Sequence, residues 1–246
     1  DWNIANGENA IPDDIEMITE EARILFPGEY LVLTEDPSSL PSLYPYTRTS
    51  KILQVETLPS FAVSADEVFL IIPDGSISDH VPYSEDMHYP LLNSTDGVSL
   101  ERISIDRLSD DRTNWHSAAE SQGFATPGYI NSQAFTGGFS EGDVSIDPEI
   151  FSPDNDGYQD VTTISYANNS PGWVANVSVF DSEGRKVRTL RSNELIGNEG
   201  SISWDGFTDD RIHAPIGIYI IFFEAFDKDG HVNSVKKTCV LAQKLN

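Results

Sequence analysis

Hydrophobic residues recur at every second position through most of this chain, in short runs separated by turns rich in Gly, Pro, Asn and Asp. The clearest runs are residues 67–72 (EVFLII) and 216–226 (IGIYIIFFEAF), which are dominated by β-branched and aromatic side chains. A period of two is typical of β-strands that bury one face. Many short strands at close spacing predict an all-β fold built from β-sandwiches.

The first half of the chain carries its strand signals after an irregular start. Residues 1–28 are acidic and show only weak helical spacing over 15–25, so we expect them to be irregular. Three prolines in residues 37–45 predict a short helical turn and a loop. The expected strands are residues 29–34, 51–55, 67–72, 76–83, 98–105 and 115–119.

The second half repeats the same alternation after a break. Residues 136–142 hold three glycines among small polar residues, which is typical of a flexible linker. We therefore predict two domains, residues 1–133 and 144–246, joined by a linker at 134–143. About seven strands follow the linker, the number that an immunoglobulin-like sandwich uses. Residues 144–146 and 149–151 lead into an acidic loop, and the strands after it are residues 161–166, 174–180, 185–190, 200–204, 216–226 and 232–242.

Motifs in the first half resemble those of a lamin-tail domain, in the order and spacing of the bacterial secreted versions. They are residues 27–33 (PGEYLVL), residues 97–102 (GVSLER), Trp115 with Ala118, and residues 126–128 (TPG) with Asn131. The resemblance covers about residues 1–132 and implies an immunoglobulin-like β-sandwich. Family members open with a strand before the region of Trp2. That strand is absent here, so we expect a fragment that starts inside the domain and leaves an exposed edge beside residues 29–34.

The second half resembles the immunoglobulin-like domain named after the flagellar-hook capping protein. The matching motifs are residues 151–157 (FSPDNDG), 179–187 (VFDSEGRKV), 204–206 (WDG) and 215–219 (PIGIY). It is also similar to the C-terminal sorting domains of type IX secretion, which place a Gly-x-Tyr strand before a Lys-rich last strand. Residues 217–219 and Lys236 with Lys237 stand in those places, whereas the tail 243–246 departs from the sorting pattern.

Strong acidity narrows the choice of partners. The formal net charge is -25; residues 1–133 carry 23 acidic and 6 basic side chains, and residues 134–246 carry 17 and 9. Neither half has a basic patch, which disfavours binding to nucleic acid and to anionic membranes. The acidity is compatible with a protein that meets millimolar divalent cations outside the cell, and equally with solubility alone.

The remaining composition points to an exported fragment without disulfides. Cys239 is the single cysteine, and its place in an apolar alternation predicts a buried small hydrophobe. No apolar run approaches the roughly 20 residues that a membrane-spanning helix needs. The chain shows no signal peptide and does not begin with Met, so we expect a mature or excised piece of a larger protein.

Catalytic chemistry has no sequence signature here, and no catalytic residue is predicted. The histidines fall in no metalloprotease spacing, and no Gly-x-Ser-x-Gly elbow occurs. His80 and His88, near Asp79, Glu85 and Asp86, suggest a zinc site, although polar loop residues are the commoner outcome. For His116 we expect a structural hydrogen bond.

Aromatic side chains offer a binding alternative. Trp204 is expected to pack between the two sheets of the second sandwich. Exposed aromatic rings can instead form a platform on which sugars stack, and the candidates for such a platform are Trp2, Trp115, Trp173 and Tyr158.

The best candidate site is the acidic loop between the two strand patterns of the second half. Asp154, Asp156 and Asp160 supply three carboxylates in an Asp-x-Asp-Gly-x-x-Asp arrangement. Ca²⁺ takes six to eight oxygen ligands, and the segment resembles the end of a thrombospondin-type calcium loop. Ser152 stands at the first ligand position, and Ser152 and Asn155 are weaker candidates. The competing interpretation is an Asx-turn in which the carboxylates accept bonds from backbone amides.

The sequence thus predicts a non-catalytic, C-terminal portion of a bacterial secreted or cell-surface protein, serving adhesion, spacing, or surface anchoring and sorting. Its expected partner is a surface polysaccharide or a protein, with Ca²⁺ as the possible cofactor. The alternative is an accessory part of a secreted hydrolase, a nuclease, phosphoesterase or glycosidase, that contributes to substrate binding. This alternative rests on the appearance of lamin-tail domains beside such enzymes.

Overall fold

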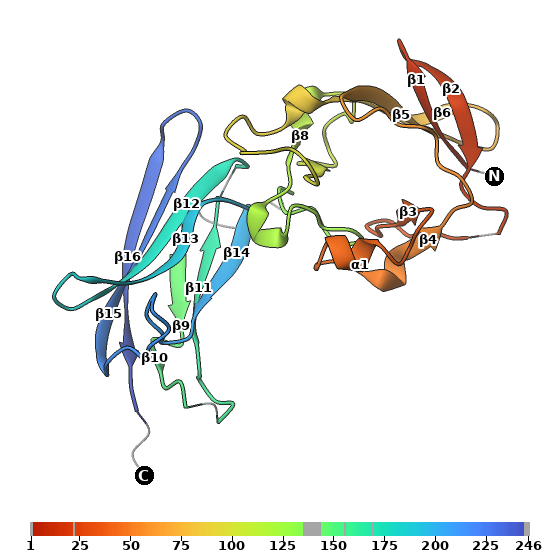
Figure 1. Cartoon of the computed structure of the whole chain (residues 1–246). Coiled ribbons are helices and arrows are strands. Elements are labelled where there is room, and N and C mark those ends of the chain that lie inside the picture. Colours follow the sequence, from red (N-terminus) through yellow and green to blue (C-terminus); the bar gives the residue numbers. More distant parts are fainter. Residues whose placement is uncertain (1, 22, 135–143, 155, 169, 244–246) are drawn as a thin grey trace. The chain divides into compact units, whose positions relative to one another are not determined.

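The chain folds into two units whose regular secondary structure is almost entirely β. The computed structural model describes residues 2–21, 23–134, 144–154, 156–168 and 170–243 (Figure 1). Strands hold 43% of the residues and helices 7%, so the predicted all-β class is confirmed. The chain divides into Asp1–Ala134 and Phe135–Asn246. The predicted linker, 134–143, lies almost wholly outside the described residues.

The main sheet of the first unit has four antiparallel strands in the order β2-β1-β5-β6. Their bounds are β1 Asn3–Glu8, β2 Ile11–Met17, β5 Ala65–Ile71 and β6 Ile77–Ser84. The hairpin predicted from residues 67–72 and 76–83 is present as β5 and β6.

The expectation that residues 1–28 are irregular is wrong, because β1 and β2 form a hairpin there and β1 pairs with β5. The period-two signal was hidden because most of β2 is exposed and carries acidic residues on both faces. Only Ala5 of β1 is fully buried, and it packs with Phe69 and Ile71 in a small core cluster.

Smaller elements complete the first unit. Two parallel strands, β3 Val32–Thr34 and β4 Ile52–Gln54, pair with each other, as do antiparallel β7 Leu100–Arg102 and β8 Trp115–Ser117. The predicted helical turn is α1, Leu40–Leu43. Four single turns of 3₁₀-helix are Thr49–Lys51, Glu85–Met87, Arg112–Asn114 and Glu120–Gln122. Within the described residues, no helix has both the length and the apolar character to cross a membrane.

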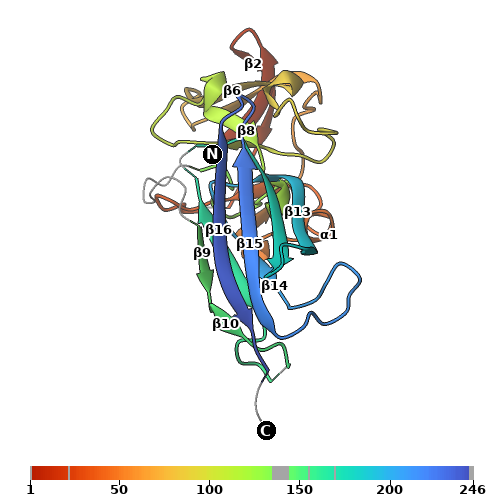
Figure 2. The ribbon, with the colours of Figure 1, turned by 90° about the vertical axis from the view of Figure 1, so that its left-hand side faces the viewer.

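The second unit is a β-sandwich of two sheets. One sheet has the order β10-β16-β15-β12-β13 and the other β14-β11-β9; Figure 2 shows the long strands β15 and β16 side by side. The bounds are β9 Val144–Asp147, β10 Ile150–Phe151, β11 Thr162–Ala167, β12 Trp173–Asp181, β13 Lys186–Ile196, β14 Glu199–Trp204, β15 Gly217–Phe226 and β16 Val232–Leu241.

One hydrophobic core fills the space between these two sheets. Along β15 the residues Tyr219, Ile221, Phe223 and Ala225 are buried at every second position, as the alternation requires. Trp204 of β14 is 0% exposed, and its ring centroid lies 4.9 Å from that of Tyr219. The predictions that Trp204 packs between the sheets and that Cys239 is buried are both confirmed.

Candidate functional site

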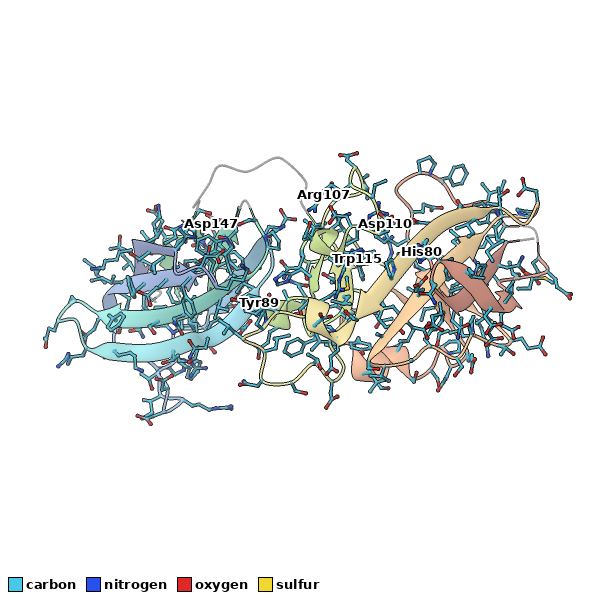
Figure 3. All side chains as sticks on the ribbon, turned by 90° about the horizontal axis from the view of Figure 1, so that it is seen from above. His80, Tyr89, Arg107, Asp110, Trp115 and Asp147 are labelled. Carbon is cyan, nitrogen blue, oxygen red and sulfur yellow. The ribbon has the colours of Figure 1, made fainter. Side chains whose placement is uncertain are left out.

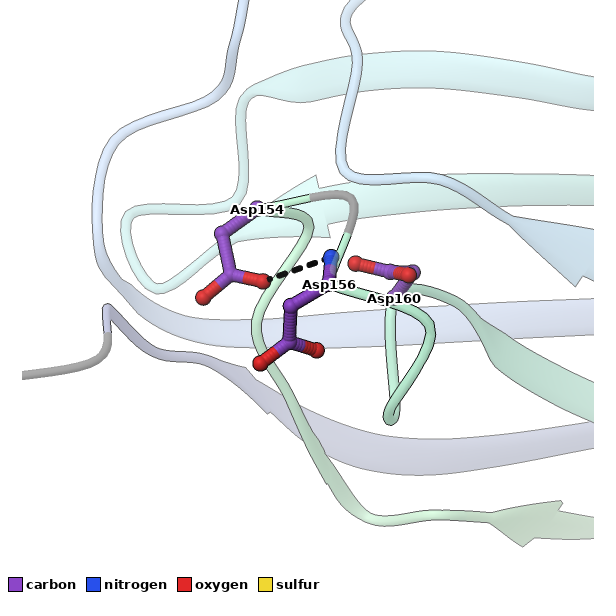
Figure 4. A group of neighbouring side chains, drawn as sticks. All are labelled: Asp154, Asp156 and Asp160. Carbon is purple, nitrogen blue, oxygen red and sulfur yellow. Dashed lines mark hydrogen bonds between the residues drawn. The ribbon is translucent and has the colours of Figure 1, made fainter.

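Three carboxylates gather on the loop between β10 and β11. Ligand oxygens of Asp154, Asp156 and Asp160 all lie within 4.8 Å of one another (Figure 4). Asp154 and Asp156 are exposed, and Asp160 is half-buried. The structure therefore brings together the three residues that the sequence singled out, on the side of the loop that faces solvent.

Hydrogen bonds from backbone amides to the three carboxylates hold this loop. The amide of Asp156 donates to Asp154 Oδ1 at 3.2 Å, that of Gly157 to Asp160 Oδ2 at 2.9 Å, and that of Tyr158 to Asp156 Oδ1 at 2.9 Å. Gly157 has a φ of 84°, a left-handed conformation that favours glycine. The Asx-turn interpretation therefore describes real contacts in the loop.

These contacts are compatible with calcium. A carboxylate has two oxygens with about four lone-pair sites, so one amide bond leaves capacity for a cation. Two exposed carboxylates and one half-buried carboxylate that lie close together form a hard-oxygen donor set of the kind that Ca²⁺ prefers. Ser152 anchors the loop through its backbone, accepting from the amide of Asp154 at 2.8 Å and donating to Gln159 O at 2.9 Å. Asn155 lies outside the described residues.

The two histidines considered for zinc are engaged by different partners. His80 of β6, labelled in Figure 3, pairs through Nε2 with Glu67 Oε2 at 2.8 Å and stacks on Phe69 at 4.4 Å. His88 Nδ1 lies 3.0 Å from Ser117 Oγ. Among the described residues the only group of three metal-ligating side chains is the aspartate cluster. The zinc site is therefore not assembled.

The contact between His88 and Ser117 is a serine–histidine pair that the sequence did not reveal. The two residues are 29 positions apart, and no motif links them. Ser117 is 0% exposed, and its hydroxyl also accepts from the amide of Tyr89 at 2.8 Å. Burial lowers the pKa of His88. Because no substrate reaches a fully enclosed hydroxyl, this pair is structural in the observed conformation.

His116 fulfils its predicted role and sits beside the same serine. Its Nδ1 lies 3.0 Å from the carbonyl oxygen of Ser117, and its ring meets that of Tyr89 at 5.3 Å. Burial lowers the pKa of His116, and the nearby His88 lowers it further. A neutral imidazole is thus favoured at this position.

The aromatic residues considered for sugar stacking are not gathered in one place. Trp2 is 45% exposed and Tyr158 is 69% exposed. Trp115, labelled in Figure 3, donates from Nε1 to Ser109 O at 2.8 Å, and Trp173 donates to Ser170 Oγ at 3.1 Å. Within the described parts of the chain, no ring contact joins any two of the four.

Comparisons with known proteins give only distant likenesses. No family model and no curated protein matches the chain. Among solved structures, PorU in its dimeric latent form and PorZ, both from Porphyromonas gingivalis, are similar at 13% and 16% identity, each with a TM-score of 0.32. These matches cover 76% and 74% of this chain, but 13% of the PorU chain and 22% of the PorZ chain. PorZ is described as an essential bacterial surface component of the type IX secretion system.

A third likeness is to CopC from Methylosinus trichosporium. Its identity is 16% and its TM-score 0.25, over 35% of this chain and 79% of CopC. At these identities and TM-scores, none of the three structures carries a function over to this chain.

Proposed function

We propose that this chain is a non-catalytic part of a bacterial secreted or cell-surface protein, serving adhesion, spacing or anchoring. The observation that carries the proposal is that the reactive polar side chains of the chain make structural contacts. The groups best suited to acid–base or nucleophilic chemistry are engaged in structural contacts, as in the pairs of His80 with Glu67 and of His88 with Ser117. The sandwich of the second unit supplies the kind of rigid scaffold that such proteins use to present loops.

Calcium is part of the proposal for the second unit. Asp154, Asp156 and Asp160 would supply the charged ligands, and the Ca²⁺ would remove their mutual repulsion. The cation would fix the loop that leads from β10 into β11. Its role is then structural, stabilising the sandwich at millimolar calcium outside the cell.

A sorting role in type IX secretion is the finer form of this proposal. It is supported by the sequence resemblance and by the placement of its motif residues. Gly217 and Tyr219 lie on β15, and Lys236 and Lys237 lie on the neighbouring strand β16, where Lys237 pairs with Ile221. A reporter enzyme fused ahead of the full chain, expressed in a bacterium with type IX secretion, should reach the cell surface. Retention of the fusion in the periplasm would contradict the sorting role alone.

The non-catalytic role is tested by turnover and binding together. The purified full chain should not hydrolyse plasmid DNA, a phosphate monoester or chromogenic glycosides, with Ca²⁺ or Mg²⁺ present, faster than its Ser117→Ala variant. It should co-sediment with intact bacterial cells or bind a purified surface polysaccharide. Robust turnover that a single substitution abolishes would overturn the proposal in favour of a hydrolase.

A further inference from the structure

An apolar pocket in the first unit is not explained by the proposed role. Its volume is ≈ 640 Å³. Small-molecule sites commonly have volumes of about 300–1,000 Å³. The lining includes Trp2, Ile18, Leu31, Leu33, Leu53 and Leu70. These residues come from separate segments that meet only in the folded chain.

The pocket lies between the faces of two sheets. Leu33 of β3 and Leu53 of β4 are paired neighbours, so their side chains form one apolar face. Leu70 lies on β5 between Phe69 and Ile71, which are buried in the small core cluster on the opposite face of that strand. Leu70 itself is only half-buried. The hydrophobic surface on this side of β5 therefore faces the pocket instead of a packed core.

The apolar side chains that line the pocket remain partly exposed to solvent. Leu31, Leu33 and Leu53 are all half-buried, while Trp2 is 45% exposed and Leu25 is 52% exposed. Contiguous exposed apolar surface of this kind is typical of a binding site. A bound apolar molecule would remove it from water, which is the main source of affinity for such ligands.

Charge decides which apolar molecule fits. The polar residues of the lining are Thr19, Glu21 and Arg23, one acid and one base. The pKa of the Glu29 carboxyl is lowered mainly by its hydrogen bond with Lys51, and the charge of Arg23 adds a smaller contribution. The surrounding residues 1–133 hold 23 acidic and 6 basic side chains. An anionic head group would be repelled, and an uncharged molecule would not.

Backbone pairing argues against an added peptide strand at the main sheet. Strand β1 is already paired with β2 and β5, and β5 with β1 and β6. Residues 3–5 of β1 and 69–71 of β5 are each paired on both sides, so this part of the main sheet has no open edge, which a β-strand ligand would need. The pocket presents side-chain faces, which suit a ligand without hydrogen-bonding demands.

We infer that the first unit binds a small, uncharged, apolar molecule in the pocket formed by Trp2, Ile18, Leu31, Leu33, Leu53 and Leu70. This activity is distinct from the proposed adhesion or anchoring role and does not depend on it. Trp2 stands among the lining residues as the aromatic side chain, and its ring would be covered on binding.

The test uses the full chain and the neutral fluorescent probe N-phenylnaphthylamine. Titration should give saturable binding of one probe per chain. Leu53→Phe places extra carbon atoms in the pocket and should weaken binding about tenfold, a loss of about 1.4 kcal/mol. The matched control is Leu91→Phe, at an exposed residue that does not line the pocket, and it should bind as the wild type does. The anionic probe anilinonaphthalenesulfonate should bind more weakly than the neutral one.

Circular dichroism and a melting curve establish that each variant is folded. If Leu53→Phe does not fold, Leu33→Ala takes its place, because it removes apolar contact without adding bulk. The inference is overturned by unsaturable uptake of the probe, or by equal affinity in a folded pocket variant and the control. It is also overturned if sedimentation shows that a second copy of the chain displaces the probe as protein concentration rises.

Discussion

At the scale of single residues, a buried carboxylate organises the end of the first unit. Glu101 of β7 is 3% exposed and accepts from Thr126 Oγ1 at 2.5 Å, Ser132 Oγ at 2.5 Å and the amide of Gln133 at 3.3 Å. It thus ties β7 to the last described residues before the domain boundary. A buried polar group is stabilising when it is bonded, and costly when its partners are left alone.

Glu101→Ala should therefore be strongly destabilising. It removes three bonds at once and leaves two hydroxyls and an amide without their acceptor, a cost of about 3 kcal/mol. Denaturant unfolding of the full chain measures it. Glu56→Ala, at an exposed glutamate of the same unit, should change the free energy of unfolding by less than about 0.5 kcal/mol. Similar values for the two variants would contradict this role for Glu101.

Cys239 should be inert in the folded chain. It is 1% exposed, and burial raises the pKa of its thiol to about 12. Since the thiolate is the reactive form, a disulfide reagent at pH 8 should label native protein negligibly and label denatured protein at one thiol per chain. Because the thiol pKa is 9.0 in the unfolded chain and about 12 in the folded one, the unfolded chain loses this proton first. The free energy of unfolding should therefore fall as the pH rises from 9.0 toward about 12. Fast labelling of native protein would show that the core opens.

These two residues show what the sequence can reveal at this scale. Cys239 was predicted to be buried because it continues the apolar alternation of its own strand. Glu101 was not singled out as buried, because a charged residue in a short strand is ordinarily on the solvent face. Its partners lie 25 to 32 positions away, so local sequence carries no sign of them.

At the scale of elements, the last strand has an unprotected side. Strand β16 pairs with β15 along its whole length, but with β10 only at Val240 and Leu241. Within the described residues, the earlier part of β16 has no partner on that side. Lys237 shares its face with the buried Cys239, yet it is exposed. An inward-pointing charge on an edge strand is a known way to prevent edge-to-edge association.

Replacing Lys237 with an apolar residue should allow the exposed edge of β16 to associate with a second copy of the chain. Lys237→Val restores the apolar alternation of β16, because Val235, Cys239 and Leu241 lie on the same face. We expect the variant to self-associate at concentrations where the wild type does not, measured by sedimentation velocity. Lys228→Val removes the same charge from the turn before β16 and should leave association unchanged. Association of both variants would indicate a net-charge effect instead.

The loop between β10 and β11 gives the test of calcium. Extracellular modules bind Ca²⁺ with Kd of about 10⁻⁴–10⁻³ M, so about 5 mM Ca²⁺ should stabilise the second unit by about 1–2 kcal/mol. The melting temperature should then rise by a few degrees over EDTA, and less with Mg²⁺. Asp156→Asn keeps an acceptor for the amide of Tyr158 but removes a charge, and it should abolish the calcium effect. Asp210→Ala, at an exposed aspartate on another loop, should preserve it. If the wild type melts at the same temperature in Ca²⁺ and in EDTA, the loop does not bind calcium and is only an acidic turn.

The alternation of hydrophobic and polar residues predicts some strands better than others. Strands β12, β15 and β16 were predicted nearly to their ends. Strands β12 and β15 bury alternate side chains over a long run, whereas β16 buries only Cys239 and Leu241. Residues 98–105 were expected to be a strand, and only Leu100–Arg102 is one. There the side-chain amide of Asn114 accepts a hydrogen bond from the backbone N–H of Ser104 and donates one to its carbonyl oxygen, which ends the strand pairing. The three aspartates of the calcium candidate could be read from sequence because they lie within a single loop.

At the scale of the whole molecule, charge sets the response to salt. A formal net charge of -25 on 246 residues means that like charges repel one another more in the compact state than in the expanded one. Raising the ionic strength from about 0.01 M to about 1 M shortens the Debye length from roughly 30 Å to roughly 3 Å. Sodium chloride should therefore raise the melting temperature of the full chain.

The larger rise is expected in the first unit, because residues 1–133 carry most of the excess of acidic groups. Differential scanning calorimetry across the salt series measures this rise. Choline chloride at the same ionic strength should act alike, because screening does not depend on the cation.

The salt series also separates calcium coordination at the aspartate loop from general charge screening. Screening is nearly complete at about 1 M salt, so a calcium effect that persists there reflects coordination by Asp154, Asp156 and Asp160. A melting temperature that stays constant or falls with salt would show that repulsion does not limit the stability of this acidic chain.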